Sequence, residues 1–499
     1  DSTHMTHTLN GVPLLVVGAG IMGVGIAQVA AQAGHTVMLF DTRDGASTEA
    51  KDKLAKTLDS LVAKGKLSAE VAAQTLGRID TISALTEAAS ARVVVEAIVE
   101  NLAIKRGLFQ QLEAIVAPDA VLATNTSSIS VTAIANGLQH PGRLVGMHFF
   151  NPVPLMKLVE VVSGLQTDAA VAAAIFDLSK AWGKVPVHAR STPGFIVNRI
   201  ARPYYAETLA LLLERAATPA VLDACLRSAG FRMGPCELMD LIGHDTNLAV
   251  TQSVYEANFY DKRFMPSLVQ REMVDGGLLG RKSGRGFFAY GEGAAAITPE
   301  NIESMPLPTA RLLRVHGQGS LAQALAGALE KTGQAFLHVP VSDWLGLEID
   351  GAQLRLTDGR TASQMGADVA VFDLPLTVGG GAALAWAPSL QATPTWTSTA
   401  ARWLAALGFK PQRIADVPGL VVARTLAMLI NEASDAVLQG VCTPEGADAA
   451  MKLGVNYPAG PFEWLAQWNP ATVITLLDAL DTHYRGERYR VSPWLRRLV

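Results

Sequence analysis

The chain has 499 residues, enough for about three compact domains at roughly 150 residues each. Its 41 Lys and Arg residues against 45 Asp and Glu residues give a net charge of −4, which leaves no basic surplus for nucleic acid or an anionic membrane. Hydrophobic residues make up 49% of the chain. Every apolar run is nevertheless interrupted before it reaches the roughly 18 residues of a membrane span, so we expect no transmembrane helix.

Three cysteines are too few for a disulfide framework in a chain of this length, which favours a reducing, cytoplasmic location. The histidines are scattered and the cysteines isolated, so the sequence predicts no metal site. Residues 1–11 are set aside as a cloning remnant before Met5 and an N-terminal extension.

The first part of the chain alternates strand and helix patterns. The apolar run Leu14–Val17 ends in a glycine turn, an amphipathic stretch follows to Ala33, and a second apolar run, Thr36–Phe40, is closed by Asp41. Further β-branched runs follow at Val93–Val95, Val121–Ala123, Leu144–Met147, Val159–Val162 and Val185–Val187. This pattern predicts an α/β, doubly wound parallel sheet of the Rossmann type over residues 12–191.

Long helical patterns, Phe195–Arg215 and Pro219–Ala229, then predict an all-α helical domain over residues 192–296. Short strands reappear at Leu312–Val315 and Val369–Phe372, which indicates a reduced Rossmann-like unit over 309–411. The run Val417-Pro418-Gly419-Leu420-Val421-Val422-Ala423-Arg424 repeats the pattern of Thr192-Pro193-Gly194-Phe195-Ile196-Val197-Asn198-Arg199. We therefore expect a second helical domain over 412–499.

The turn after the first strand has the spacing of a dinucleotide-binding loop. Gly18 permits the tight turn, Gly20 lets the backbone approach a pyrophosphate, and Gly23 lets the helix pack on the strand. Ile21 and Met22 lie between them, where the first helical N–H groups would point at the phosphates. A purely structural glycine turn is the alternative.

Asp41 stands at the end of the second strand pattern, about twenty residues after this turn. Its carboxylate can take both ribose hydroxyls and would repel a 2′-phosphate, which favours NAD. Arg43 leaves NADP open, because a guanidinium there could meet a 2′-phosphate or stack on adenine.

Three polar residues follow or end strand patterns: Ser127, His148 and Glu160. The carboxyl ends of parallel strands line the ligand crevice of an open sheet, so these side chains can converge. A histidine beside a glutamate suggests a general base oriented by a carboxylate. The alternative is that His148 is a hydrogen-bonded histidine at a strand end without a role in catalysis.

Four segments together resemble the 3-hydroxyacyl-CoA dehydrogenases. They are residues 18–23, 125–128 (Asn-Thr-Ser-Ser), 148–160 and 192–199, and the interval of twelve residues from His148 to Glu160 agrees with the family pattern. The resemblance runs from near Leu14 to the Gly284-Arg285-Gly286-Phe287 segment. The longer form, with a reduced Rossmann-like unit, is similar to the enzymes that oxidise 3-hydroxyadipyl-CoA in aerobic phenylacetate breakdown.

The resemblance implies NAD-dependent oxidation of a (S)-3-hydroxyacyl-CoA, as in fatty acid β-oxidation. It implies that His148 removes the proton of the 3-hydroxyl group, that Glu160 orients His148, and that Ser127 and Asn198 hydrogen-bond the substrate oxygen. It also assigns cofactor contacts to Glu100, Lys105, Asn151 and Lys282, with the adjacent Arg281 as an alternative to Lys282, and supports Lys64 loosely as a contact for the phosphates of coenzyme A.

Family members dimerise through the helical domain, so the resemblance implies that the second helical copy occupies the partner's position as an intrachain pseudo-dimer, with a homo-oligomer also open. Ala423 replaces Asn198 in this copy, which is therefore not a second active site. Two other functions stay open: a non-catalytic NAD- or acyl-CoA-binding protein of the same fold, and another β-hydroxyacid dehydrogenase, which would normally depend on a catalytic lysine.

Overall fold

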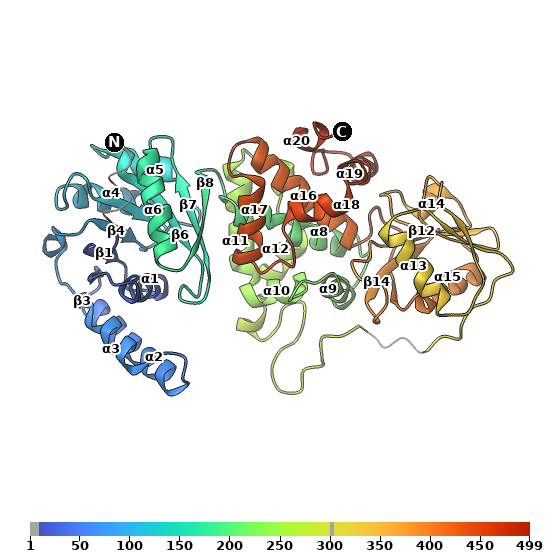
Figure 1. The fold of residues 1–499 in the computed structure, drawn as a ribbon, viewed down its shortest axis with the longest axis horizontal. Coiled ribbons are helices and arrows are strands. Elements are labelled where there is room, and N and C mark those ends of the chain that lie inside the picture. Colours follow the sequence, from blue (N-terminus) through green and yellow to red (C-terminus); the bar gives the residue numbers. More distant parts are fainter. Residues whose placement is uncertain (1–8, 300–303) are drawn as a thin grey trace. The chain divides into compact units, whose positions relative to one another are not determined.

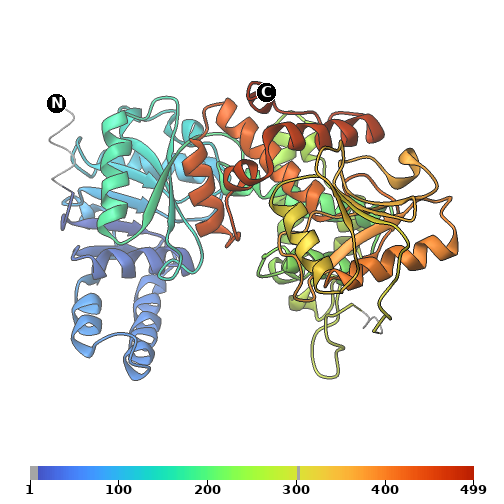
Figure 2. The same ribbon diagram turned by 45° about the vertical axis from the view of Figure 1, so that its right-hand side comes forward.

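The computed structural model describes residues 9–299 and 304–499. The chain forms two compact units (Figures 1 and 2). Of the described residues, one unit contains those up to Arg199 together with Gln439–Val455, and the other contains those from Ile200 to Leu438 together with Asn456–Val499. Among the described residues, no helix combines the length and the apolar character needed to cross a membrane.

An eight-stranded sheet forms the centre of the first unit, with the strand order β3-β2-β1-β4-β5-β6-β7-β8. This order, with neighbours that are not consecutive in the chain, is that of a doubly wound Rossmann sheet, as the sequence predicted. The strands are β1 Leu14–Val17, β2 Val37–Phe40, β3 Ile79–Thr81, β4 Val93–Glu96, β5 Val121–Thr124, β6 Leu144–Phe149, β7 Leu158–Ser163 and β8 Val185–Arg190.

The helices of this unit connect and cover the strands. α2 and α3 form a hairpin that projects from the sheet (Figures 1 and 2), and α17, far along the chain, packs against β7 and β8. The helices are α1 Ile21–Gln32, α2 Ala46–Ala63, α3 Ala69–Gly77, η1 Leu85–Ala88, α4 Leu102–Glu113, α5 Val131–Ala135, η2 Pro141–Arg143, α6 Ala169–Ala181, α7 Val197–Ile200 and α17 Pro444–Gly454.

The expectation of an entirely parallel sheet is wrong at one point. β6 and β7 run antiparallel, and β8 is parallel to β7. Only residues 150–157 connect β6 to β7. A parallel connection needs a crossover of about a dozen residues or more, so this short loop forces the chain to turn back beside β6. The reversal places His148 directly opposite Glu160.

The second unit contains a seven-stranded mixed sheet in the order β10-β9-β11-β12-β13-β14-β15. β11 and β12 form a hairpin through Asp350 and Gly351, both with positive φ, so a tight turn stands where a Rossmann sheet has a helical crossover. The strands are β9 Leu313–His316, β10 Leu337–Val339, β11 Gly346–Ile349, β12 Ala352–Leu356, β13 Val369–Phe372, β14 Ala383–Pro388 and β15 Lys410–Arg413.

Helices make up the rest of the second unit. The helix expected over Phe195–Arg215 is interrupted at Ala201, and α8 begins after it with Pro203 in its first turn. The helices are α8 Arg202–Leu213, α9 Pro219–Ser228, α10 Pro235–Ile242, α11 His244–Ala257, η3 Lys262–Phe264, α12 Leu268–Asp275, η4 Arg281–Ser283, α13 Ser320–Glu330, α14 Ala362–Met365, α15 Pro394–Ala406, α16 Val422–Leu438, α18 Pro461–Trp468, α19 Pro470–Tyr484 and α20 Pro493–Arg496.

The repeated segments 192–199 and 417–424 adopt the same backbone device. In each, a residue after glycine has positive φ, Phe195 at 48° and Leu420 at 52°, and a buried carboxylate binds the N–H groups that follow. Glu160 accepts hydrogen bonds from the N–H groups of residues 196 and 197, and Asp373 accepts from those of residues 421, 422 and 423. The internal repeat thus extends to the conformation and the anchoring of the chain.

The two helical copies pack together through α8 and α16. A guanidinium of α16, Arg424, is fully buried and lies 3.1 Å from Glu207 of α8, whose Oε1 also accepts from the hydroxyl of Tyr489. Buried ion pairs add little net stability, but removing one partner leaves an uncompensated charge, so such pairs select one way of packing.

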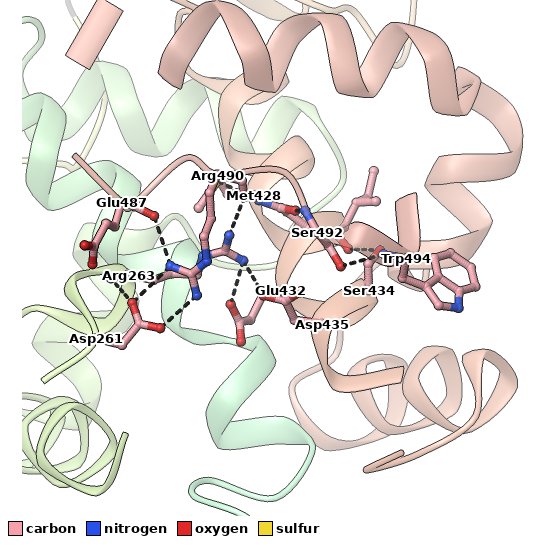
Figure 3. Close-up of polar contacts among 12 residues, drawn as sticks. Asp261, Arg263, Met428, Glu432, Ser434, Asp435, Glu487, Arg490, Ser492 and Trp494 are labelled. Atoms are coloured by element: carbon pink, nitrogen blue, oxygen red, sulfur yellow. Dashed lines mark hydrogen bonds and ion pairs between the residues drawn. The ribbon is translucent and has the colours of Figure 1, made fainter. Parts of the chain in front are cut away.

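A second polar cluster also joins the two helical copies (Figure 3). Arg263 of η3 lies 3.0 Å from Asp435 and 3.3 Å from Glu432 on α16, and it donates to the carbonyl oxygen of residue 490. Arg490 in turn pairs with Asp261 at 2.8 Å. The cluster therefore links the first helical copy, α16 and the C-terminal segment.

Asp373→Ala tests the anchoring device of the second copy. The substitution leaves buried N–H groups without an acceptor, at about 1–3 kcal/mol each, and we expect the free energy of unfolding to fall by at least about 3 kcal/mol in urea titrations followed by circular dichroism. Asp343→Ala, at an exposed carboxylate, is the control. Equal unfolding midpoints for the two variants would show that the anchor contributes nothing.

Candidate active site

The glycine turn joins β1 to α1 with the geometry that a pyrophosphate site requires. A Cβ atom at Gly18 would lie 2.4 Å from the Ala97 carbonyl oxygen, and one at Gly23 would lie 1.7 Å from the Gly18 carbonyl oxygen. Gly20, by contrast, faces open space, and no side chain caps the first turn of α1. Ile21 is 77% exposed and Met22 half-buried beside it. The N–H groups at this helix start can therefore receive phosphate oxygens.

Asp41 follows β2 beside this turn, and its Oδ2 accepts a hydrogen bond from the N–H of Ala19 at 2.8 Å. Hydrogen bonds from the Arg43 guanidinium hold the pKa of Asp41 at about 2, against the opposing effect of burial. The ion pair between Arg43 and Asp41, 3.1 Å long, also means that the Arg43 charge is directed at a carboxylate. The site therefore presents an ionised acid where the ribose hydroxyls of a dinucleotide would lie.

A buried ionic network follows β4 and β5. Glu96, the last residue of β4, is fully buried and lies 2.5 Å from the ammonium of Lys105, whose side chain is 1% exposed. Glu96 also accepts from the hydroxyl of Thr124 at 2.6 Å and from the N–H of Ile98 at 2.7 Å. Sequence reasoning missed Glu96, although a charged residue that closes an apolar strand was a visible signal.

Glu100 lies at the outer end of the same network. Its Oε1 is 2.9 Å from the Lys105 ammonium, and its Oε2 accepts from the hydroxyls of Thr126 and Ser128. Burial opposes its ionisation, but the Lys105 charge and these hydrogen bonds hold the pKa of Glu100 below its usual value. The side chain of Glu100 is 39% exposed and therefore accessible to a ligand. Lys105, the other predicted cofactor contact, is buried behind it at 1% exposure.

His148 and Glu160 form a buried pair across the β6–β7 ladder. Nδ1 of His148 lies 2.8 Å from Oε2 of Glu160, and the two residues are 6% and 0% exposed. Oε1 of Glu160 is fixed by the N–H groups of Ile196 and Val197, at 3.2 and 2.9 Å. Because a carboxylate only accepts, Nδ1 carries the proton and Nε2 is the nitrogen that can receive another.

Aromatic rings flank this histidine. The centroid of the Phe150 ring lies 4.5 Å from that of His148, and the Phe195 ring lies 5.9 Å away on another segment. The sequence predicted that His148 and Glu160 meet, but for a reason that holds only in part. They meet as cross-strand neighbours of an antiparallel pair, not at the aligned ends of parallel strands.

Ser127 and Asn198 lie in segments tied to this pair. Asn125, in the same loop as Ser127, accepts a hydrogen bond from the N–H of Phe149, next to His148, at 2.8 Å. Ser127 and Asn198 are both half-buried, and Asn198 directly follows Val197, whose N–H binds Glu160. The loop after β5 and the start of α7 are thus fixed to the strands that carry His148 and Glu160.

The remaining expected contacts are Asn151, Lys64 and Lys282. Asn151 is exposed in the loop after β6, and Lys64 is exposed at the C-terminal end of α2. Lys282 belongs to the other unit, where its ammonium lies 2.6 Å from Asp245. Within residues 9–299 and 304–499, no group of three or more His, Cys, Asp and Glu side chains could hold a metal ion.

Three family models together match most of the chain. The NAD binding domain of 3-hydroxyacyl-CoA dehydrogenase matches residues 14–192, and the C-terminal domain of 3-hydroxyacyl-CoA dehydrogenase matches residues 194–290 and 419–499. The reduced Rossmann-fold domain of 3-hydroxybutyryl-CoA dehydrogenase matches residues 354–418. The C-terminal model thus matches two separate segments, which the reduced Rossmann-fold domain divides.

Individual relatives agree with these models. The chain is 43% identical to 3-hydroxyadipyl-CoA dehydrogenase of Escherichia coli K12 over 98% of its own length and 97% of the relative's. A crystal structure of 3-hydroxybutyryl-CoA dehydrogenase from the same species matches with a TM-score of 0.87 and 42% identity over 98% of both chains. The mitochondrial hydroxyacyl-coenzyme A dehydrogenase of Sus scrofa is 40% identical over 55% of this chain and 90% of its own length. The chain therefore belongs to the 3-hydroxyacyl-CoA dehydrogenase family of NAD-dependent oxidoreductases.

Proposed function

We propose that the chain oxidises (S)-3-hydroxyadipyl-CoA to the 3-oxoacyl-CoA, with His148 as the base. The buried His148–Glu160 pair, 2.8 Å apart and anchored by two N–H groups, carries the assignment of the base. The identity of 43% with the 3-hydroxyadipyl-CoA dehydrogenase of Escherichia coli supports the substrate. 3-Hydroxybutyryl-CoA is the second candidate substrate, since the crystal structure that matches with a TM-score of 0.87 is named a 3-hydroxybutyryl-CoA dehydrogenase.

In the proposed mechanism, Nε2 of His148 takes the proton of the 3-hydroxyl group while the hydride leaves C3. NAD supplies the hydride acceptor. Glu160 keeps Nδ1 protonated and stabilises the imidazolium that forms. Ser127 and Asn198 hydrogen-bond the oxygen as it becomes a carbonyl.

In this proposal the turn Gly18–Gly23 would hold the pyrophosphate of NAD, and Asp41 would bind the hydroxyls of its adenosine ribose. Glu100 and Asn151 would contact the nicotinamide side of NAD, and Lys105 would act on the cofactor through its ion pair with Glu100. From the family resemblance we also assign Lys282 to the cofactor and Lys64 to the phosphates of coenzyme A.

For the architecture, we propose domain boundaries at 12–191, 192–296, 309–411 and 412–499, with the two helical copies as an intrachain pseudo-dimer. The contact of α8 with α16 and the buried Arg424–Glu207 pair support this arrangement. Further homo-oligomerisation is compatible with it. The three cysteines, none in a Cys-x-x-Cys pair, support a cytoplasmic location.

His148→Gln tests the proposed base. Loss of general base catalysis typically costs about 10²–10⁴-fold, so we expect kcat to fall in that range in an NADH absorbance assay with acetoacetyl-CoA, while the Kd for NADH stays unchanged. A variant as fast as the unmodified chain would exclude His148 as the base. If the unmodified chain binds NADH without any turnover, the chain is a non-catalytic member of the fold.

Glu160→Gln tests the orienting carboxylate. The amide can still accept from the N–H of Val197, but it no longer neutralises an imidazolium, so we expect a loss of kcat of about 10²-fold or more. Glu113→Gln is a matched control, because Glu113 also accepts from two N–H groups of the same unit, those of Gln139 and His140. Equal kcat values for the two variants would contradict the role of Glu160.

Asp41→Asn tests the preference for NAD. Without the charge held by Arg43 and the Ala19 N–H, repulsion of a 2′-phosphate disappears, and we expect the ratio of kcat/KM for NAD over NADP to fall by about tenfold or more, or about 1.4 kcal/mol. Lys53→Met, at an exposed lysine of α2, provides the control. An unchanged ratio would place the discrimination elsewhere.

Substrate choice is tested by comparing 3-hydroxyadipyl-CoA with 3-hydroxybutyryl-CoA in the unmodified chain. We expect the adipyl substrate to have a kcat/KM at least about tenfold higher, roughly 1.4 kcal/mol, because a pocket for its second carboxylate discriminates by at least that much. Equal values, or a preference for the butyryl substrate, would keep the dehydrogenase and exclude the adipyl assignment.

A further inference from the structure

The turn between α6 and β8, residues 182–184, and the first residue of β8 support the segment that follows the proposed catalytic histidine. The ring of Trp182 stacks on Phe149, the last residue of β6, with centroids 6.1 Å apart and an angle of 22°. The N–H of Val185 donates to the carbonyl oxygen of Lys157 at 2.8 Å. Trp182 thus contacts the residue just before the loop 150–157 that connects β6 to β7, and Val185 binds the last residue of that loop.

Lys184 is the last residue of this turn and is 7% exposed. Its ammonium donates to the carbonyl oxygens of Val153 and Met156, the latter at 2.7 Å. Burial lowers the pKa of Lys184 to about 8, and repulsion from Lys157 contributes. A buried charge depends on strong acceptors, and here the acceptors are backbone atoms of the loop itself, so the lysine and the loop conformation depend on each other.

The loop 150–157 also packs against α1, the helix that follows the glycine turn. Val153 is 2% exposed, and a Cβ atom at Gly25 of α1 would lie 2.8 Å from its Cβ. The loop is therefore held between α1, which the glycine turn opens, and the ammonium of Lys184. Phe150 and Asn151 lie in the sequence between β6 and the anchored residue Val153. The ring of Phe150 contacts His148.

We propose that Lys184 is a positioning residue of the dehydrogenase, which fixes the loop 150–157 and thereby sets Phe150 and Asn151 beside His148. It acts through two backbone carbonyl groups and not on the reacting atoms. The inference rests on the proposed roles of His148 and Asn151.

Lys184→Met tests this inference, because the side chain keeps its apolar body and loses its donors. The N–H groups of Leu155 and Met156, both bonded to the Pro152 carbonyl oxygen at 3.0 Å, report on the loop by hydrogen exchange and mass spectrometry. We expect at least fivefold faster exchange in a peptide covering the loop, with β1 and α1 unchanged. We also expect a higher KM for NADH and a kcat/KM lower by about 10- to 100-fold, since small displacements of positioned groups cost on that order.

Lys157→Met is the matched control, because this exposed lysine of the same loop donates only a long hydrogen bond, 3.5 Å, to the carbonyl oxygen of Gly183 and acts on Lys184 by charge repulsion alone. It should leave exchange and kinetics within twofold of the unmodified chain. Lys184→Arg, which restores N–H donors on a cation, should return the kcat/KM to within about threefold. A merely structural lysine would not show this combination of faster loop exchange, changed KM and rescue.

Two results would overturn the inference: unchanged exchange of the loop in Lys184→Met, or faster exchange with kcat and KM unaltered. If Lys184→Met does not fold, Lys184→Gln, a shorter neutral donor that cannot reach both carbonyl groups, takes its place under the same criteria. Failure of the proposed function appears separately, as full activity of His148→Gln, and the exchange measurement does not depend on it.

Discussion

The candidate active site depends on one buried carboxylate. Glu160 has no solvent exposure, and it divides its two oxygens between His148 and the N–H groups at the start of α7. An ionised group in such a place needs all of these donors, so it constrains the register of β6 with β7 and the path of residues 192–199 at once. A slip of one residue in that register would turn Glu160 to the other face of the sheet and separate it from His148.

The second copy keeps the anchoring part of this arrangement but lacks the amide of Asn198. Asp373 binds the N–H groups at the start of α16 as Glu160 binds those at the start of α7, and Ala423 stands where the first copy has Asn198. The copy instead supplies Arg424 and the carboxylates that meet Arg263, which pack it against the first helical copy. The second copy thus preserves the features that anchor the start of α16 and that pack α16 against the first helical copy.

Two buried lysines hold parts of the candidate site in position. Lys105 lies between Glu96 and Glu100, and Lys184 donates to the loop that follows His148. Each holds a more exposed element in place, a carboxylate in one case and a loop in the other. Buried ammonium groups are costly to move or to leave unpaired, so they fix conformations that the exposed side chains alone would not hold.

The sequence by itself determined the features that are local or repeated: the glycine turn with Asp41, the Rossmann alternation, the duplicated helical segment and the pairing of His148 with Glu160. Each of these is a short pattern whose residue types and spacing carry the information. Only the tertiary structure decided the reversal at β7, the attachment of α17 to the first sheet, and the positions of Glu96, Lys105 and Lys184. A lysine in a helical or turn pattern has the appearance of a solvated charge, and its burial depends on contacts with distant residues that no local periodicity encodes.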